Sequence, residues 1–228
     1  MTPGSEDRAR PAGVLRDAYA ALAAVVAPLG EEEAWLPTDC AGWAVGDLVH
    51  HLLTDAQRAL VALHTPAAPP PDRDAVTYWR DWAPDPVGAA HELRRTRVAA
   101  STFPDFGRLR ELYLETAAAT VTAASEADPE RRVATQGHVL TVGDLLTTLG
   151  VEATVHHLDL ARALPTAPGP SPAGLTAVRV TLDGLLGRPV PLDWGDEHYA
   201  RAATGRTPLT EAERRTLGPD ADRIPLFS

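Results

Sequence analysis

Residues 142–163, which read VGDLLTTLGVEATVHHLDLARA, decide the fold class and carry the most informative polar side chains of the chain. Steps of three and four residues trace one helix face: Val142, Leu145, Leu149, Glu152, His156, Asp159 and Ala163. The first half is an apolar stripe of the kind that packs inside a helical bundle. The second half puts two carboxylates and an imidazole where such a helix normally carries leucine. Because a carboxylate is costly to bury unless it is paired, hydrogen-bonded or bound to a metal, the pattern predicts a polar site inside the bundle.

Glu152 and His156 are the part of this face that points to a metal. They lie four residues apart, so their side chains project from the same side of a helix and can converge on one point. A surface ion pair or a buried hydrogen bond explains the same spacing, and the spacing does not choose between these interpretations. Placement in an apolar stripe favours metal binding, because one ion would satisfy both side chains.

A second helix that bears histidine is predicted at residues 44–63. Its inward face holds Val45, Leu48, Leu52, Ala59 and Leu63. His51 lies beside two of these leucines and is expected to point inward, whereas His50 points about a quarter turn away. His51, Glu152 and His156 then form a set of two histidines and one carboxylate, which leaves metal positions for water or substrate and favours a catalytic site. We expect Zn²⁺, and Fe²⁺ or Ni²⁺ also suit these donors.

The rest of the chain predicts an all-α fold. Helical periodicity places helices at about 12–29, 44–63, 86–100, 106–127, 141–164 and 173–186. No run before Arg188 reads as a strand, and proline and glycine mark a linker at 165–172. We therefore expect a four-helix bundle over residues 12–187, followed by a short C-terminal extension over residues 188–228.

Composition narrows the class of protein. A formal net charge of −10 argues against nucleic acid or an anionic membrane as a partner. The single cysteine, Cys40, excludes internal disulfides, and we expect it to be a small buried packing residue. The first ten residues lack the apolar stretch of a signal peptide, and no apolar run has membrane-spanning length, so we expect a cytoplasmic protein. The expected partners are small molecules, with the chain as a monomer or homodimer.

Two motifs carry a resemblance to a known family. The first is Gly42-Trp43-Ala-Val-Gly-Asp47-Leu-Val-His-His51-Leu52, preceded by Pro37-Thr38, and the second is Glu152-x-x-x-His156-x-x-Asp159-Leu-Ala-Arg. Both resemble signatures of the mycothiol-dependent maleylpyruvate isomerase family, which belongs to the DinB-like metal-binding four-helix bundles. The resemblance covers most of residues 12–187. It implies that His51, rather than His50, binds a divalent metal, usually zinc, together with Glu152 and His156.

The same resemblance implies supporting roles for two acidic residues and a departure at the C-terminus. Asp47 and Asp159 would support the ligands or the helices rather than bind the metal. The fullest family members carry a separate α/β domain that lends residues to catalysis, whereas a short tail follows the bundle here. That tail holds Ala203-Thr-Gly-Arg206, similar to a Thr-Gly-Arg stretch of such tails. Arg206 is expected to bind a substrate carboxylate bidentately, the alternative being a solvated surface arginine.

The resemblance implies a metal-dependent thiol transferase or cis–trans isomerase that acts on a small electrophilic substrate, with mycothiol as co-substrate. A metal-bound thiol stays ionised at neutral pH and can attack an electrophilic carbon. The composition, rich in alanine, arginine and proline, resembles that of high-GC actinobacteria, in which mycothiol is the usual thiol. Open alternatives are a metal-dependent hydrolase or lyase that uses bound water and an oxygen-using iron enzyme. A third alternative is a metal-stabilised interaction module without activity. Such modules usually complete their metal site with a cysteine ligand, and we expect no cysteine among the ligands here.

Several residues outside the motifs have two interpretations. His138 is either a solvated loop histidine or a lining residue at the mouth of a pocket. Tyr78, Trp79 and Trp82 are expected to pack over the proline-rich loop, the alternative being the wall of a ligand pocket.

Overall fold

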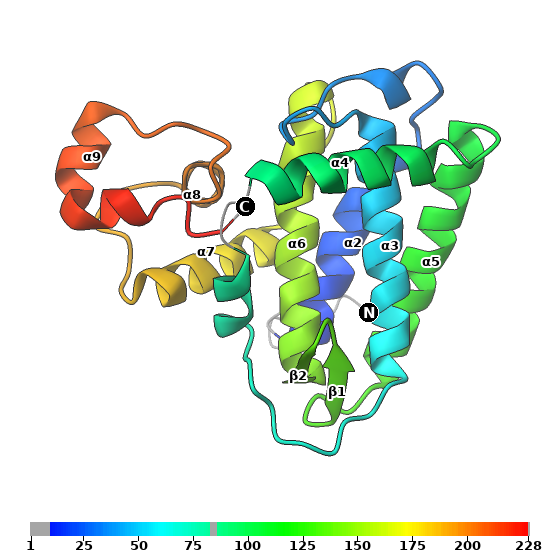
Figure 1. The fold of residues 1–228 in the computed structure, drawn as a ribbon, viewed down its shortest axis with the longest axis horizontal. Helices are drawn as coiled ribbons and strands as arrows, with labels where there is room; N and C mark the ends of the chain where they lie inside the picture. Colours follow the sequence, from blue (N-terminus) through cyan, green and yellow to red (C-terminus); the bar gives the residue numbers. More distant parts are fainter. Residues whose placement is uncertain (1–9, 83–85, 228) are drawn as a thin grey trace.

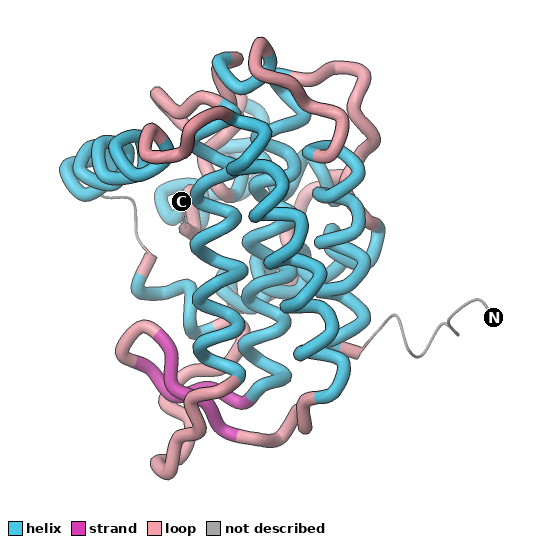
Figure 2. Tube along the Cα trace, turned by 90° about the vertical axis from the view of Figure 1, so that its right-hand side faces the viewer, coloured by secondary structure: helices cyan, strands magenta, loops and turns pink. Residues whose placement is uncertain are grey.

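The computed structural model describes residues 10–82 and 86–227, in which the chain forms eight α-helices and one β-hairpin. Four long helices run side by side as a bundle (Figures 1 and 2), with α2 packed on α6 and α3 packed on α5. They are α2 (Pro11–Val26), α3 (Val45–Leu63), α5 (Phe106–Glu126) and α6 (Val142–Ala163). The predicted all-α bundle is confirmed, and each of these helices ends within a turn of its expected range.

The apolar stripes of the bundle helices meet in one core. Leu15 and Leu22 of α2, Leu48 of α3 and Leu160 of α6 are fully buried in it. The residues that the helical periodicity placed inward therefore drive the packing, since burial of a leucine side chain contributes roughly 1.5–3 kcal/mol.

The helices α3 and α6 begin with the same four residues, Val-Gly-Asp-Leu. At the start of α3, the carboxylate of Asp47 accepts the backbone N–H of Ala44 at 3.0 Å. At the start of α6, the hydroxyl of Thr141 accepts the backbone N–H of Asp144 at 3.0 Å. Each contact gives a hydrogen-bond acceptor to a backbone amide that has none within the first turn of the helix. The two helices that carry the predicted site are thus both anchored at their first turns.

A β-hairpin precedes α6, and the prediction of no strand before Arg188 is wrong. Strands β1 (Arg132–Thr135) and β2 (His138–Thr141) pair antiparallel at one end of the bundle (Figure 2). The turn residues Gln136 and Gly137 have positive φ values of 49° and 84°, as a type I′ turn requires. Four-residue strands are too short to show clear alternation, and Gln-Gly lacks the asparagine or aspartate that usually signals this turn.

The expected helix at residues 86–100 is also present. This helix, α4 (Pro86–Ala100), crosses α3 (Figure 1). An ion pair fixes the crossing, because Nη2 of Arg97 lies 2.7 Å from Oδ2 of Asp47. The same nitrogen donates to the carbonyl oxygen of Gly42 at 2.6 Å. Asp47 therefore joins α4 to the first turn of α3, which is the structural role that the resemblance left open to it.

The C-terminal part of the chain builds a second apolar core against α6. It comprises α7 (Pro172–Leu186), α8 (Asp196–Ala203), α9 (Glu211–Leu217) and a 3₁₀ helix (Gly218–Arg223). Leu158 of α6 shares this core with Leu182 of α7 and Tyr199 of α8. Residues before and after position 188 thus contribute to one core. The division into a bundle (12–187) and an extension (188–228) stays a prediction.

Two expectations concern membranes and export. Within residues 10–82 and 86–227, every helix is too short or too polar to cross a membrane. Residues 1–9, which carry most of the expectation that no signal peptide is present, lie outside the described residues.

Replacing Gly174 with alanine should destabilise the fold, because α7 begins in direct contact with α6 at this glycine. A Cβ at Gly174 would overlap Oγ1 of Thr154 and lie 2.9 Å from Oγ of the capping residue Ser171. The buried neighbour must move, which costs about 1–3 kcal/mol of unfolding free energy. Urea denaturation measures the loss. Gly195→Ala is the control, since a Cβ there meets no atom within 4 Å. Equal losses in the two variants would contradict the expectation.

Candidate metal centre

Two bundle helices bring together the three residues that the sequence predicts as metal ligands. His51 lies on α3, and Glu152 and His156 lie one turn apart on α6. Oε1 of Glu152 is 3.3 Å from Nε2 of His51 and 3.2 Å from Nε2 of His156. The two imidazole rings meet edge to face with centroids 4.8 Å apart. One donor atom from each residue lies within 4.8 Å of the others, so the three form a group that could hold a metal ion.

Packing explains why His51 faces this group and its neighbour does not. Trp43, in the loop before α3, meets the ring of His51 edge on, with centroids 5.4 Å apart. His50 faces Phe103 instead, at a centroid distance of 6.1 Å. Adjacent residues on a helix point about 100° apart, so only one of the two histidines can face α6. The geometry agrees with the choice of His51, whose role as a ligand stays a prediction.

His156 is held from both sides of its ring. Nδ1 lies 2.9 Å from Oδ2 of Asp159, while Nε2 faces Glu152. Burial would lower the pKa of His156, but hydrogen bonds with Asp159, Cys40 and Glu152 outweigh it and raise this pKa well above its usual value. Burial would likewise raise the pKa of Glu152, but hydrogen bonds from His156 and His51 hold it far below its usual value. In the metal-free protein, Glu152 is therefore ionised and His156 is protonated, and the two side chains form a charged pair.

Arg206 completes the network from the C-terminal tail. Its Nε and Nη2 each lie 3.0 Å from a different oxygen of Asp159, and its Nη1 donates to the carbonyl oxygen of Thr204 at 2.9 Å. Arg206 thus makes its bidentate contact with the carboxylate of Asp159, whereas the sequence predicts a substrate carboxylate as the partner. Only 11% of the Arg206 side chain is exposed, which does not fit the alternative of a solvated surface arginine. Arg206 and the hydrogen bond from His156 hold the pKa of the fully buried Asp159 low against the effect of burial.

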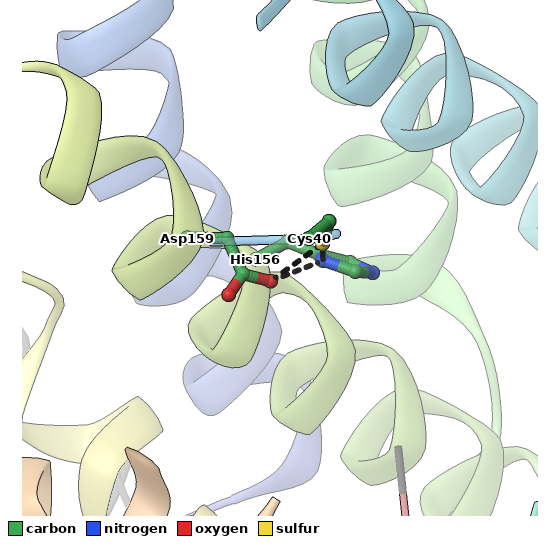
Figure 3. Close-up of side chains that lie close together, drawn as sticks. All are labelled: Cys40, His156 and Asp159. Carbon is green, nitrogen blue, oxygen red and sulfur yellow. Dashed lines mark hydrogen bonds and ion pairs between the residues drawn. The ribbon is translucent and has the colours of Figure 1, made fainter. Parts of the chain in front are cut away.

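Cys40 belongs to the polar network, which the sequence did not indicate. Its thiol donates to Oδ2 of Asp159 at 3.1 Å, and its Sγ lies 3.8 Å from Nδ1 of His156 (Figure 3). Cys40, His156 and Asp159 form a second group that could hold a metal ion. The interpretation of Cys40 as a packing residue alone is therefore incomplete. Burial raises the pKa of the thiol, so it stays protonated at neutral pH and can keep donating to Asp159.

Asp55 is a second carboxylate at the centre, and the motifs indicate no role for it. It follows His51 by one turn of α3, and its Oδ2 lies 3.2 Å from Nε2 of His51. Together with Glu152 and Tyr113 it lines a cavity of about 10 Å³, which is room for about one water molecule. The Tyr113 hydroxyl is buried without a hydrogen-bond partner in the described part of the chain. Burial raises the pKa of Asp55, and the charge of Glu152 adds to this effect.

A larger cavity, of about 210 Å³, lies beside the 3₁₀ helix Thr77–Asp81. The residues that line it are Tyr78, Trp82, Gln136 and His138. Trp79 does not join them, because it is buried and stacks on Phe227 at a centroid distance of 4.3 Å. The aromatic cluster therefore divides between the two interpretations. Trp79 packs in the core, whereas Tyr78 and Trp82 wall a pocket with His138 at its edge. We call the space lined by Tyr78, Trp82, Gln136 and His138 the aromatic cavity.

Comparisons with known proteins agree with the two motifs. The model of the mycothiol maleylpyruvate isomerase N-terminal domain family matches residues 15–161, more than half of the chain. Two solved structures also match, the crystal structure of the mycothiol-dependent maleylpyruvate isomerase and that of a mutant of it. Each has a TM-score of 0.53 at 16% sequence identity, and the match covers 79% of this chain and 70% of the other. At this identity the likeness shows the fold alone. A search of curated proteins finds no match.

Proposed function

The chain belongs to the mycothiol maleylpyruvate isomerase N-terminal domain family, and on that premise we propose that it is a metal-dependent enzyme that uses a small thiol as co-substrate. The observation that carries the proposal is the convergence of His51, Glu152 and His156 from two helices. Two imidazoles and one carboxylate, with positions left for other ligands, are the donor set of a catalytic metal site. We propose Zn²⁺ as the metal; Fe²⁺ and Ni²⁺ also accept these donors.

The two groups of donors share His156, and charge favours the group with His51. In the group with Cys40, the carboxylate of Asp159 already pairs with the guanidinium of Arg206, 3.0 Å away. A cation placed there would meet that positive charge. In the group with His51, the carboxylate of Glu152 contacts two imidazoles, which become neutral when they bind a metal. The group of His51, Glu152 and His156 therefore fits a divalent ion.

Each residue of the network has a role in holding the reacting groups. His51, Glu152 and His156 would bind the metal, which supplies a Lewis acid that keeps a coordinated thiol ionised at neutral pH. Asp159 accepts the Nδ1 proton of His156, which would leave the Nε2 lone pair for the metal. Arg206 holds Asp159 in that orientation with two hydrogen bonds. A thiolate held at the metal centre would be positioned to add to a conjugated alkene: the S–C bond would form as the C=C π bond breaks, and its electron pair would pass to the conjugated acceptor group of the substrate.

Turnover with and without thiol tests this function. Zinc-loaded protein is incubated with a panel of conjugated alkenes, epoxides and alkyl halides, each with mycothiol, with a second low-molecular-weight thiol and with no thiol. Consumption of an electrophile that requires thiol is the expected result. Equal consumption without thiol would replace this function with a metal-dependent hydrolase or lyase, for which the one-water cavity beside Glu152 and Asp55 offers a place for water. Zinc binding with no turnover of any substrate would leave a metal-stabilised interaction module.

Zinc binding should tighten as the pH rises from about 6 to about 8 and should release protons. The pKa of His156 in the folded protein lies well above the value of about 6.5 of an unfolded histidine. Protonated His156 therefore stabilises the metal-free fold fully below pH of about 6.5, and this contribution is lost as the pH rises through the raised pKa. The metal must displace the same proton. Calorimetry in two buffers with different heats of protonation counts the released protons, and equal heats in both would contradict the expectation.

A further inference from the structure

We propose that Asp55 is a fourth protein ligand of the ion at the metal centre, an assignment that rests on the proposed function. Asp55 lies on α3 one turn after His51, and its Oδ2 is 3.2 Å from Nε2 of His51. Oε1 of Glu152, on α6, lies 3.3 Å from the same nitrogen. One ring nitrogen therefore faces carboxylate oxygens from two helices.

A proton on His51 cannot satisfy both oxygens, because Nε2 carries at most one hydrogen. The contact with Glu152 has the geometry of a hydrogen bond, whereas Oδ2 of Asp55 is buried without a hydrogen-bond partner in residues 10–82 and 86–227. A buried carboxylate oxygen without such a partner costs free energy. When His51 binds a metal this proton is lost, and Nε2 presents a lone pair to both oxygens. A cation in contact with all three atoms removes that repulsion and satisfies Oδ2 of Asp55.

The donor atoms are spaced like neighbouring ligands of one ion. Two ligands that lie about 2.0–2.1 Å from zinc at the tetrahedral angle are about 3.3 Å apart. Oε1 of Glu152 is 3.3 Å from His51 and 3.2 Å from His156, and the contact between Asp55 and His51 is 3.2 Å long.

Asp55 must turn toward the ion to bind it, because it lies outside the group of three donors that are all within 4.8 Å of one another. The last torsion of an aspartate side chain is soft, so the turn costs little. The cavity of about 10 Å³ that Asp55 and Glu152 both line leaves space for the movement.

A fourth ligand changes which ions the centre prefers. Two imidazoles and two carboxylates carry two negative charges, which balance a divalent ion. Carboxylate donors favour harder ions such as Mn²⁺ more than imidazoles do. Zinc with four protein ligands can still expand to a fifth, so a position for the thiol of the proposed function remains. Asp55 therefore acts on the choice of metal.

Cysteine substitution tests whether residue 55 reaches the ion. Co²⁺ is added to the full chain as Asp55→Cys, as Thr54→Cys and as wild type, and near-ultraviolet absorption is recorded. A thiolate bound to Co²⁺ gives a charge-transfer band in this range. We expect the band in Asp55→Cys alone, because Thr54 projects about 100° away from Asp55 on α3.

Two results of the cobalt experiment would overturn the proposal. Asp55→Cys that binds Co²⁺ as tightly as the wild type but shows no band would leave Asp55 as a partner for water in the small cavity. A band in all three proteins would place the ion at Cys40, the thiol that they share.

Asp55→Asn tests the carboxylate itself, because the amide keeps its shape and removes its charge. We expect Zn²⁺ to bind at least tenfold more weakly and Mn²⁺ to lose more, measured by competition with a chromophoric chelator. The visible spectrum of bound Co²⁺, which reports its coordination, should also change. Glu115→Gln, at an exposed position on α5, removes one negative charge elsewhere and should leave both measurements unchanged.

The outcomes for Asp55→Asn separate the role of Asp55 from the proposed function. Wild-type affinity in this variant, or weaker binding with an unchanged cobalt spectrum, would overturn the fourth ligand and leave the proposed function standing. Metal binding that depends on Asp55, without thiol-dependent turnover, would refute the proposed function and leave Asp55 as a ligand.

Discussion

His51→Ala should abolish tight zinc binding and thiol-dependent turnover, whereas His50→Ala should leave both intact. His51 supplies one of three donors that lie within 4.8 Å of one another, and its neighbour faces Phe103 instead. Loss of a group outside a metal's ligand set costs about 10–100-fold in affinity, so we expect loss of a ligand to cost more than about 100-fold. Competition with a chromophoric chelator measures the affinity, and elemental analysis of tag-free protein measures the zinc content.

The pair of variants is matched, because the two histidines are adjacent on one helix. Circular dichroism of both variants checks that the bundle still forms. Stoichiometric zinc in His51→Ala at wild-type affinity would remove His51 from the ligand set. It would leave the group of Cys40, His156 and Asp159 as the place for the ion. Loss of zinc in Cys40→Ala but not in His51→Ala would establish that second group.

Arg206→Met should destabilise the metal-free protein by about 3–5 kcal/mol, because it leaves a buried carboxylate without its cation. Asp159 is fully buried, and both of its oxygens accept hydrogen bonds from Arg206. Methionine keeps much of the length of the side chain and removes the charge. Urea denaturation followed by circular dichroism measures the change in unfolding free energy.

Two controls isolate the charge effect. The double variant Arg206→Met with Asp159→Asn should recover part of the lost stability, since no unpaired charge is then buried. Arg215→Met, at an exposed position on α9, should change the stability by less than about 0.5 kcal/mol. A single variant as stable as the wild type would show that Asp159 does not depend on Arg206. Zinc affinity of the single variant should also fall, because His156 loses its fixed acceptor.

Local periodicity accounts for the part of the site that the sequence predicted. Glu152 and His156 occur four residues apart inside an apolar stripe, so helical geometry places them on one buried face whatever the rest of the fold does. The same geometry separates His51 from His50. The apolar stripes also determined the all-α class and the helix ranges of the bundle, because burial of those stripes is the main gain on folding.

Only the tertiary structure decided which distant residues complete the site. Cys40 reaches Asp159 from a loop 119 positions away, and Arg206 reaches it from 47 positions away. Neither residue belongs to a periodic pattern, so its neighbours depend on how loops and tail pack on α6. The hairpin that carries Gln136 and His138 was missed for a related reason, since strands of four residues leave almost no pattern. The periodicity of a helix is visible in the sequence of one segment. Contacts between distant segments depend on how the elements pack, so they cannot be read from the sequence of either segment alone.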